Sequence, residues 1–220
     1  MNLVREYTKR LAVCIFGLAL CSLSMAIGIK AGEVGTNAWN TLAIGIGNAA
    51  GTTFGGASLM ISSVIVIIDI VGRGRLGFGT LFNAFLIPYF ADLFVVLLGV
   101  VPDAPNMIWG MVYTLFAQML LSFALVVYMR PALGCGPRDT LMVIVGKMMP
   151  KAPIGIAKFV LEAAVLAVGT LLGAPFGLGS ILILILQASM FQFACHVCKF
   201  EPRAVEHENF LDTIRRIKNR

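Results

Sequence analysis

Two acidic residues within apolar runs are the side chains of this sequence best placed for chemistry. Glu162 lies near the middle of one run, with Lys158 one helical turn before it, and Asp92 lies in the middle of another. Ionisable groups are costly inside a membrane and mark pathways for ions or protons. We therefore predict ion or proton coupling at Asp92 or Glu162. The structural alternatives are an i,i+4 ion pair between Lys158 and Glu162, and an acid kept neutral by burial.

A glycine-rich segment that occurs twice could bind a solute. The two copies are Gly35-Thr36-Asn37-Ala38-Trp39-Asn40-Thr41-Leu42 and Gly134-Cys135-Gly136-Pro137-Arg138-Asp139-Thr140-Leu141. In each copy a permissive glycine backbone precedes a residue suited to start a helix, Thr36 or Asn37 in one and Pro137 in the other. The alternative is that the glycines serve only close helix packing. The predicted substrate-binding residues are Gly35, Asn37, Asn40, Gly134, Gly136, Arg138 and Asp139.

The helix starts predict the sign of the solute's charge. Unpaired N–H groups and partial positive charge at a helix N-terminus favour an anion or a carbonyl-like dipole. Arg138 beside the second start strengthens this preference, whereas Asp139 opposes it or pairs with Arg138. We therefore expect an anionic or zwitterionic small solute.

Other kinds of site find little support in the sequence. Cys195-His196-Val197-Cys198 offers at most three metal ligands, spaced too closely along a helix to converge. We find no constellation of nucleophile, base and metal, and no phosphate-binding or dinucleotide fingerprint in a suitable context. The sequence therefore predicts no enzyme, no metal and no cofactor.

The composition tells which elements must position these residues. Of the 220 residues, 59% are hydrophobic and only 13% are charged, which is typical of a polytopic membrane protein. The net charge of +6 does not indicate a nucleic-acid partner, because the basic residues form short clusters between apolar spans. We therefore predict an all-α polytopic membrane protein whose main partner is the lipid bilayer.

Six apolar runs are long enough to cross a hydrocarbon core, which takes about 20 helical residues. They are residues 11–29, 55–71, 80–101, 107–129, 155–172 and 180–198. Two shorter helical stretches, 37–50 and 137–150, would reach only about 21 Å of a core roughly 30 Å thick. The sequence therefore predicts six spanning helices and two short re-entrant or half helices.

The distribution of positive charge favours re-entrance. If both short stretches enter and leave on the same side, all but Lys30 of the 17 Lys and Arg residues lie on the cytoplasmic side, with both termini. The re-entrant segments are then 31–50 and 131–150. The alternatives are helices lying flat on the membrane, and short, tilted spanning helices.

Three crossings per copy make the chain an inverted-topology internal repeat. The first repeat covers residues 1–101, the second 102–200, and residues 201–220 form a basic cytoplasmic tail. Secondary transporters often follow this plan and bind their solute near the midplane, between the repeats. We expect the two short helices to begin there, facing one another.

The pattern resembles a bacterial family, the YczE/YyaS/YitT-type integral membrane proteins. The likeness rests on Gly134-Cys135-Gly136-Pro137-Arg138-Asp139, on its earlier copy, and on the Gly-x-Gly-Thr/Ser motifs at Gly77 and Gly177. The earlier copy has Ala38-Trp39-Asn40 where the resemblance leads us to expect proline, an aromatic residue and aspartate. The resemblance implies a multi-pass protein of the bacterial plasma membrane and supplies no settled substrate.

Two functions are compatible with these observations. The first is a secondary transporter or channel-like facilitator for a small polar solute, bound between the repeats. The second is a non-transporting membrane partner or assembly subunit whose tail docks a cytoplasmic protein. The oligomeric state stays open, and a homo-oligomer is compatible with either function.

Overall fold

The chain folds as an all-α protein. The computed structural model describes residues 3–72, 77–134, 136–149, 151 and 154–201. Within these residues the eight α-helices are α1 (Leu3–Ile29), α2 (Ala38–Ala50), α3 (Phe54–Val71), α4 (Phe78–Leu97), α5 (Met107–Met129), α6 (Pro137–Met148), α7 (Ile154–Leu171) and α8 (Leu178–Val197). Two 3₁₀ turns, η1 (Gly32–Val34) and η2 (Leu98–Val100), precede α2 and follow α4. The predicted helical class is confirmed.

Five helices of the described chain are long and apolar enough to cross a membrane: α1, α3, α4, α5 and α8. The sixth predicted span corresponds to α7, which has 18 residues, as many as α3. The two short stretches form α2, of 13 residues, and α6, of 12. At 1.5 Å per residue, neither short helix matches the thickness of a hydrocarbon core.

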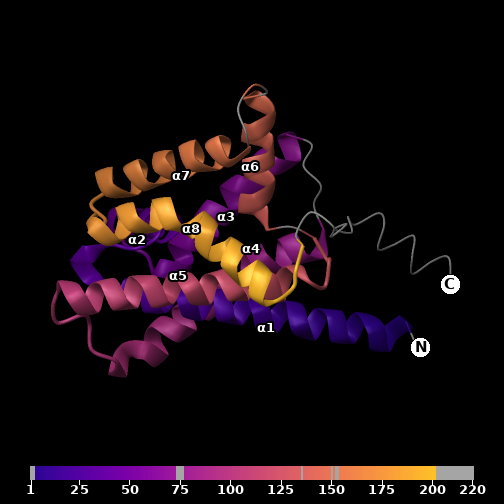
Figure 1. Ribbon diagram of the computed structural model, residues 1–220, viewed down its shortest axis with the longest axis horizontal. Helices are drawn as coiled ribbons and strands as arrows, with labels where there is room; N and C mark the ends of the chain where they lie inside the picture. The colour runs from indigo at the N-terminus through magenta and orange to yellow at the C-terminus, as the bar shows by residue number, and fades with distance from the viewer. Residues whose placement is uncertain (1–2, 73–76, 135, 150, 152–153, 202–220) are drawn as a thin grey trace.

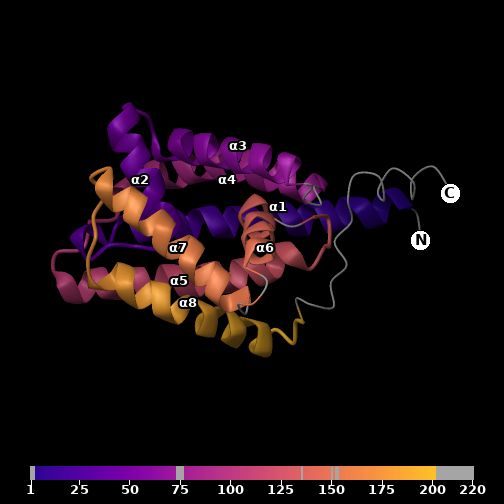
Figure 2. The ribbon, with the colours of Figure 1, turned by 90° about the horizontal axis from the view of Figure 1, so that it is seen from above.

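The long helices run side by side along the long axis of the molecule, whereas α6 crosses them steeply (Figure 1). Successive long helices run in opposite directions, so that α1 begins and α8 ends at the same end of the bundle. In both views α2 lies toward the opposite end and α6 lies nearer the end where α1 begins (Figure 2). The two short helices thus occupy different levels along the bundle.

The packing partners of the helices follow a repeated pattern. Helix α1 packs on α4 as α5 packs on α8, and α2 packs on α3 as α6 packs on α7. In addition, α2 contacts α7 and α6 contacts α3, while α1 and α5 pack on one another. The contacts of each half of the chain therefore have counterparts in the other half.

Small residues set the closest of these contacts. A Cβ atom on Gly169 of α7 would lie 2.6 Å from the backbone nitrogen of Leu42 in α2, and one on Gly45 would lie 2.5 Å from the Gly169 carbonyl oxygen. Such distances leave no room for a side chain, so α2 and α7 touch backbone to backbone. Close approach through glycine is the usual way in which helices pack in membranes.

Backbone contacts also join the halves at the segments before the short helices. The Gly79 N–H donates to the Leu133 carbonyl at 2.8 Å, which ties the start of α4 to the segment before α6. Gly35, at φ 84°, packs against Ser180 of α8, and its carbonyl accepts a hydrogen bond from Thr114 Oγ1 at 2.8 Å. Each glycine-rich segment is thereby held by a long helix of the other half.

The outer surface of the bundle is strongly apolar. Large side chains are exposed along every long helix; on α3 they include Val64, Ile67, Ile70 and Val71. The core contains mostly small residues together with Leu18, Met25, Ile87 and Tyr128. A protein that turns its larger apolar side chains outward is suited to an apolar solvent.

Candidate functional site

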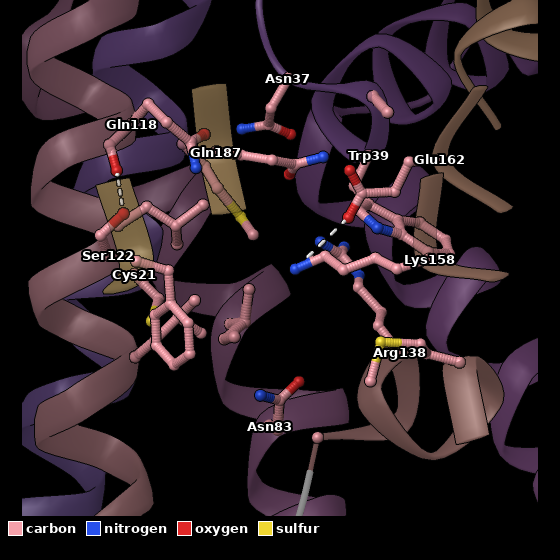
Figure 3. Close-up of a pocket in the computed structure, with 18 of the residues that line it drawn as sticks. Cys21, Asn37, Trp39, Asn83, Gln118, Ser122, Arg138, Lys158, Glu162 and Gln187 are labelled. Carbon is pink, nitrogen blue, oxygen red and sulfur yellow. Dashed lines mark hydrogen bonds and ion pairs between the residues drawn. The ribbon is translucent and has the colours of Figure 1, made fainter. Parts of the chain in front are cut away.

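A cavity of about 110 Å³ lies between the starts of α2 and α6. Asn37 and Ala38 line it at the start of α2, and Gly136 lines it at the start of α6. Helices α1, α4, α5, α7 and α8 complete the wall, so both halves of the chain contribute. Figure 3 shows the polar side chains that converge on it. A space of this size holds a few water molecules or a small organic solute.

The start of α2 is capped by its own side chain. Asn37 is the N-cap, and its Oδ1 accepts a hydrogen bond from the Asn40 N–H at 3.0 Å. The Asn37 carbonyl accepts from Thr41 Oγ1 at 3.1 Å. Because Oδ1 is engaged in the cap, the NH₂ group of Asn37 is the part of its amide left to a solute. Asn37 therefore offers the cavity a neutral donor.

The start of α6 is built without a capping side chain. Gly136 is the N-cap and Pro137 takes the first helical position, where its missing N–H costs nothing. The Gly136 N–H donates to the hydroxyl of Tyr128 at 3.1 Å. Arg138 follows, and its guanidinium lies 4.8 Å from the ring centroid of Trp39 in α2. A cation–π contact of this kind joins the first turns of the two short helices.

Two charged residues of α7, Lys158 and Glu162, lie on the side of the cavity that carries Arg138. Lys158 Nζ lies 3.8 Å from Glu162 Oε1, so the i,i+4 ion pair named above as a structural alternative is present. The Glu162 side chain is 8% exposed and that of Lys158 is 36% exposed, so the acid is the inner member of the pair. Arg138, Lys158 and Glu162 lie on one side of the cavity in Figure 3.

Neutral polar residues that were not predicted as site residues also line the cavity. Gln118 and Ser122 of α5 line the cavity, together with Gln187 of α8 and Asn83 of α4. Gln118 is 5% exposed, and its Oε1 has no hydrogen-bond partner among the described residues. A neutral polar side chain in the middle of an apolar span was the signal that could have found it.

Several predicted residues lie beside the cavity and do not line it. Asn40 is buried and donates from Nδ2 to the Met25 carbonyl at 3.1 Å and to Thr36 Oγ1 at 3.4 Å. Gly35 and Gly134 pack against the starts of α8 and α4. These three residues hold the neighbouring helices in place without lining the cavity. The side chain of Asp139 lies outside the described parts of the chain.

Asp92 lies elsewhere, at the start of α3. Its carboxylate accepts hydrogen bonds from Thr53 Oγ1 and from the Gly55 N–H, each at 2.6 Å. Negative charge and acceptor oxygens at a helix N-terminus satisfy unpaired N–H groups. The cavity is not lined by Asp92, so the two acids predicted for coupling are not brought together.

The described charged groups give the cavity wall a positive balance. The charged side chains that line the cavity and are described are Arg138, Lys158 and Glu162, with a net charge of +1. Two helix N-termini add partial positive charge, and Asn37 adds a donor. The cavity therefore has positive charge and hydrogen-bond donors in its wall.

Comparisons with known proteins give the family of this chain. A protein of Haemophilus influenzae described as uncharacterized is 28% identical over 190 residues, which cover 86% of this chain and 84% of the relative. An uncharacterized membrane protein of Bacillus subtilis, YczE, is 26% identical over 191 residues, 86% of this chain and 87% of the relative.

No solved structure matches the chain with significance. With bacterial relatives and long apolar helices, the chain is a multi-pass membrane protein in contact with the lipid bilayer. The resemblance to YczE-type proteins is confirmed. Residues 8–196 match a family of unknown function, DUF6198, and the chain belongs to this family.

Proposed function

We propose that the protein is a secondary transporter or channel-like facilitator for a small polar solute that carries negative charge. The observation that carries the proposal is the cavity between the starts of α2 and α6, which both halves of the chain line. Transporters of inverted-repeat design bind their solutes where broken helices meet at the midplane. The solute is held there by helix N-termini and Arg138.

The proposal includes an inverted repeat with α2 and α6 as re-entrant helices. The repeated contact pattern supports it, since α2 lies between α3 and α7 and α6 also contacts both of these helices. The alternating directions of the long helices support it too, because α2 and α6 each follow one long helix and precede another without adding a crossing (Figures 1 and 2). Each short helix then enters from its own side.

The proposed orientation places the start of α1 and the end of α8 in the cytoplasm of a bacterial cell. Arg10 lies in the first half of α1 and Arg130 directly follows α5 at this end of the bundle, and Lys147 lies in the last turn of α6. Lys30 follows α1 at the opposite end and pairs with Asp103 at 3.0 Å. Positive residues concentrate on the cytoplasmic side of membrane proteins.

Glu162 is the proposed coupling group. It lies inside the cavity wall and its exposed neighbour Lys158 lies nearer the start of α7, toward the proposed cytoplasmic side. A proton or cation that reaches Glu162 would change the charge balance around a bound anion. Asp92 is not included, because it caps α3.

Uptake into proteoliposomes tests the proposal, with a panel of radiolabelled small organic anions and zwitterions as probes. We expect Arg138→Ala to lower uptake of a transported probe by about tenfold or more, since a charge-assisted contact is lost. Lys147→Ala is the matched control, because it removes an exposed positive charge from the same helix. Equal uptake by both variants, or no uptake of any probe by the native protein, would contradict the proposal.

The docking alternative depends on the tail at 201–220, of which residues 202–220 lie outside the described residues. Removing residues 202–220 separates the two functions. A transporter retains most of its uptake without the tail, whereas a docking subunit loses its activity. Retained uptake in the truncated chain therefore supports transport.

A further inference from the structure

An unpaired acceptor in the cavity points to a second feature of the solute. Gln118 lies on α5 and its side chain reaches the cavity from the side opposite Arg138 (Figure 3). Its Oε1 is buried without a hydrogen-bond partner among the described residues. Leaving a buried acceptor unpaired costs about 1–3 kcal/mol, so a bound group that donates to it contributes strongly to affinity.

Among the described residues, no polar group of the protein donates to this oxygen. Ser122, one turn further along α5, uses its hydroxyl to donate to the Gln118 backbone carbonyl at 2.9 Å. The Gln118 Oε1 atom can therefore accept a hydrogen bond from a bound solute. Arg138 and Lys158 carry positive charge on the other side of the cavity.

The charge balance decides what kind of donor fits. The described charged side chains of the cavity sum to one positive charge, which a single negative charge neutralises. An ammonium group at Gln118 would bring a second positive charge and would meet only a neutral amide oxygen. Stripping water from an ammonium costs far more than one neutral hydrogen bond returns. A hydroxyl or amide N–H group loses much less on the same transfer.

We infer that the solute is a small monoanion that carries a neutral hydrogen-bond donor, such as a hydroxycarboxylate, and that Gln118 selects for this donor. The inference rests on the proposed function and narrows its solute class. The anionic group lies toward Arg138 and the start of α6. The hydroxyl or amide group donates to Gln118 Oε1. A site built to accept a hydrogen bond discriminates strongly against analogues that lack the donor.

Three probes of similar size separate the alternatives: 2-hydroxypropanoate, propanoate and alanine. The measurement is thermal stabilisation of the purified full chain in detergent over a range of probe concentrations, from which apparent affinities follow. We expect 2-hydroxypropanoate to bind at least about tenfold more tightly than propanoate, and more tightly than alanine. Equal binding of the two acids, tighter binding of alanine, or no stabilisation by any probe would overturn the inference.

Two variants test whether Gln118 causes the preference for the acid that carries a hydroxyl group. Gln118→Leu removes the acceptor and keeps a side chain of similar size. The ratio of the affinities for 2-hydroxypropanoate and propanoate should therefore fall to about one. Gln192→Leu makes the same change at an exposed position of α8 and should leave the preference as in the native protein. An unchanged preference in Gln118→Leu would contradict the assignment. If that variant does not fold, Gln118→Met replaces it with another unbranched side chain.

Arg138→Ala distinguishes the failure of this inference from the failure of the proposed function. The variant should weaken binding of both acids by a similar factor, because they share the carboxylate. If both acids still bind Arg138→Ala as tightly as the native protein, the anion site itself is wrong. If Arg138→Ala loses binding but Gln118→Leu keeps the preference, only the role of Gln118 is wrong.

Discussion

The start of α2 and the start of α6 border the same cavity but satisfy their backbone groups by different means. In both, a threonine one turn into the helix donates to the N-cap carbonyl, Thr41 to Asn37 at 3.1 Å and Thr140 to Gly136 at 3.3 Å. At α2 the Asn37 side chain also closes the first turn. At α6 the N-cap is glycine, which has no side chain to do so. The threonine hydrogen bonds are therefore the same at the two helix starts, whereas the capping residues differ.

The difference assigns separate tasks to the two starts. The start of α2 is neutral and capped by its own asparagine, so it provides a fixed wall with one donor. The start of α6 carries Arg138, which reaches across to the face of Trp39. The proposed anion would gain most from the α6 side, where a full positive charge accompanies the helix N-terminus. In the proposed function, the start of α2 therefore contributes a fixed wall and the start of α6 contributes positive charge.

The two short helices also differ in how they cross the long helices. At the α2–α7 crossing, Gly169 meets backbone atoms of Leu42. At the α3–α6 contact, a Cβ on Gly72 would instead meet the Cδ1 atom of Ile144, 2.6 Å away. A side-chain terminus can rotate away, whereas a backbone cannot. The α2–α7 contact therefore has less room for an added methyl group than the α3–α6 contact.

The same substitution at the two crossings gives the largest expected effect. Gly169→Ala forces α7 away from α2 and should destabilise the protein by about 3 kcal/mol, which exceeds the roughly 1 kcal/mol that alanine gains in helix propensity. Gly72→Ala meets the tip of Ile144 and, at 3.1 Å, the Ile68 carbonyl oxygen, and should cost about 1 kcal/mol, less than Gly169→Ala. Melting temperatures in detergent measure both. Equal losses would show that the crossings do not differ in the room they leave for an added methyl group.

An acid in the place of Asn40 tests the difference between the starts directly, because the corresponding residue of the other copy is Asp139. Asn40→Asp replaces a donor to the Met25 carbonyl by a buried carboxylate. The expected loss is about 3 kcal/mol, since burying an acceptor against an acceptor outweighs the roughly 0.5 kcal/mol gained from the helix dipole. Asn40→Ala, which adds no charge, should lose less. The measurement is the thermal unfolding of both variants. If Asn40→Asp is more stable than Asn40→Ala, the expected penalty for a buried carboxylate is wrong.

The sequence predicted the helices closely because their signals are local. The expected short stretch 37–50 is observed as α2 at Ala38–Ala50, and the expected 137–150 as α6 at Pro137–Met148. Apolar length, glycine, and capping or proline residues set such boundaries without reference to the rest of the fold. The Lys158–Glu162 pair was predictable for the same reason, since helical spacing brings the two residues together.

The site was predictable only in part, because it depends on how helices rotate and approach one another. Asp92 was predicted to couple ions or protons, but the face of α4 that carries it turns toward the start of α3. The contact between Trp39 and Arg138 joins residues far apart in the chain and has no local signal. Gln118 had such a signal, because it is an amide in the middle of an apolar span.

The cap of α2 gives the smallest expected effect and separates structure from binding at the same residue. Asn37→Ala removes the bond to the Asn40 N–H and should cost about 1 kcal/mol of stability. Asn37→Asp keeps a capping oxygen and should retain most of this stability, but it places a negative charge beside the proposed anion. Thermal unfolding should therefore rank aspartate above alanine, whereas uptake of an anionic probe should rank alanine above aspartate. A single ranking in both measurements would mean that capping alone explains Asn37, and that the two helix starts do not share the solute.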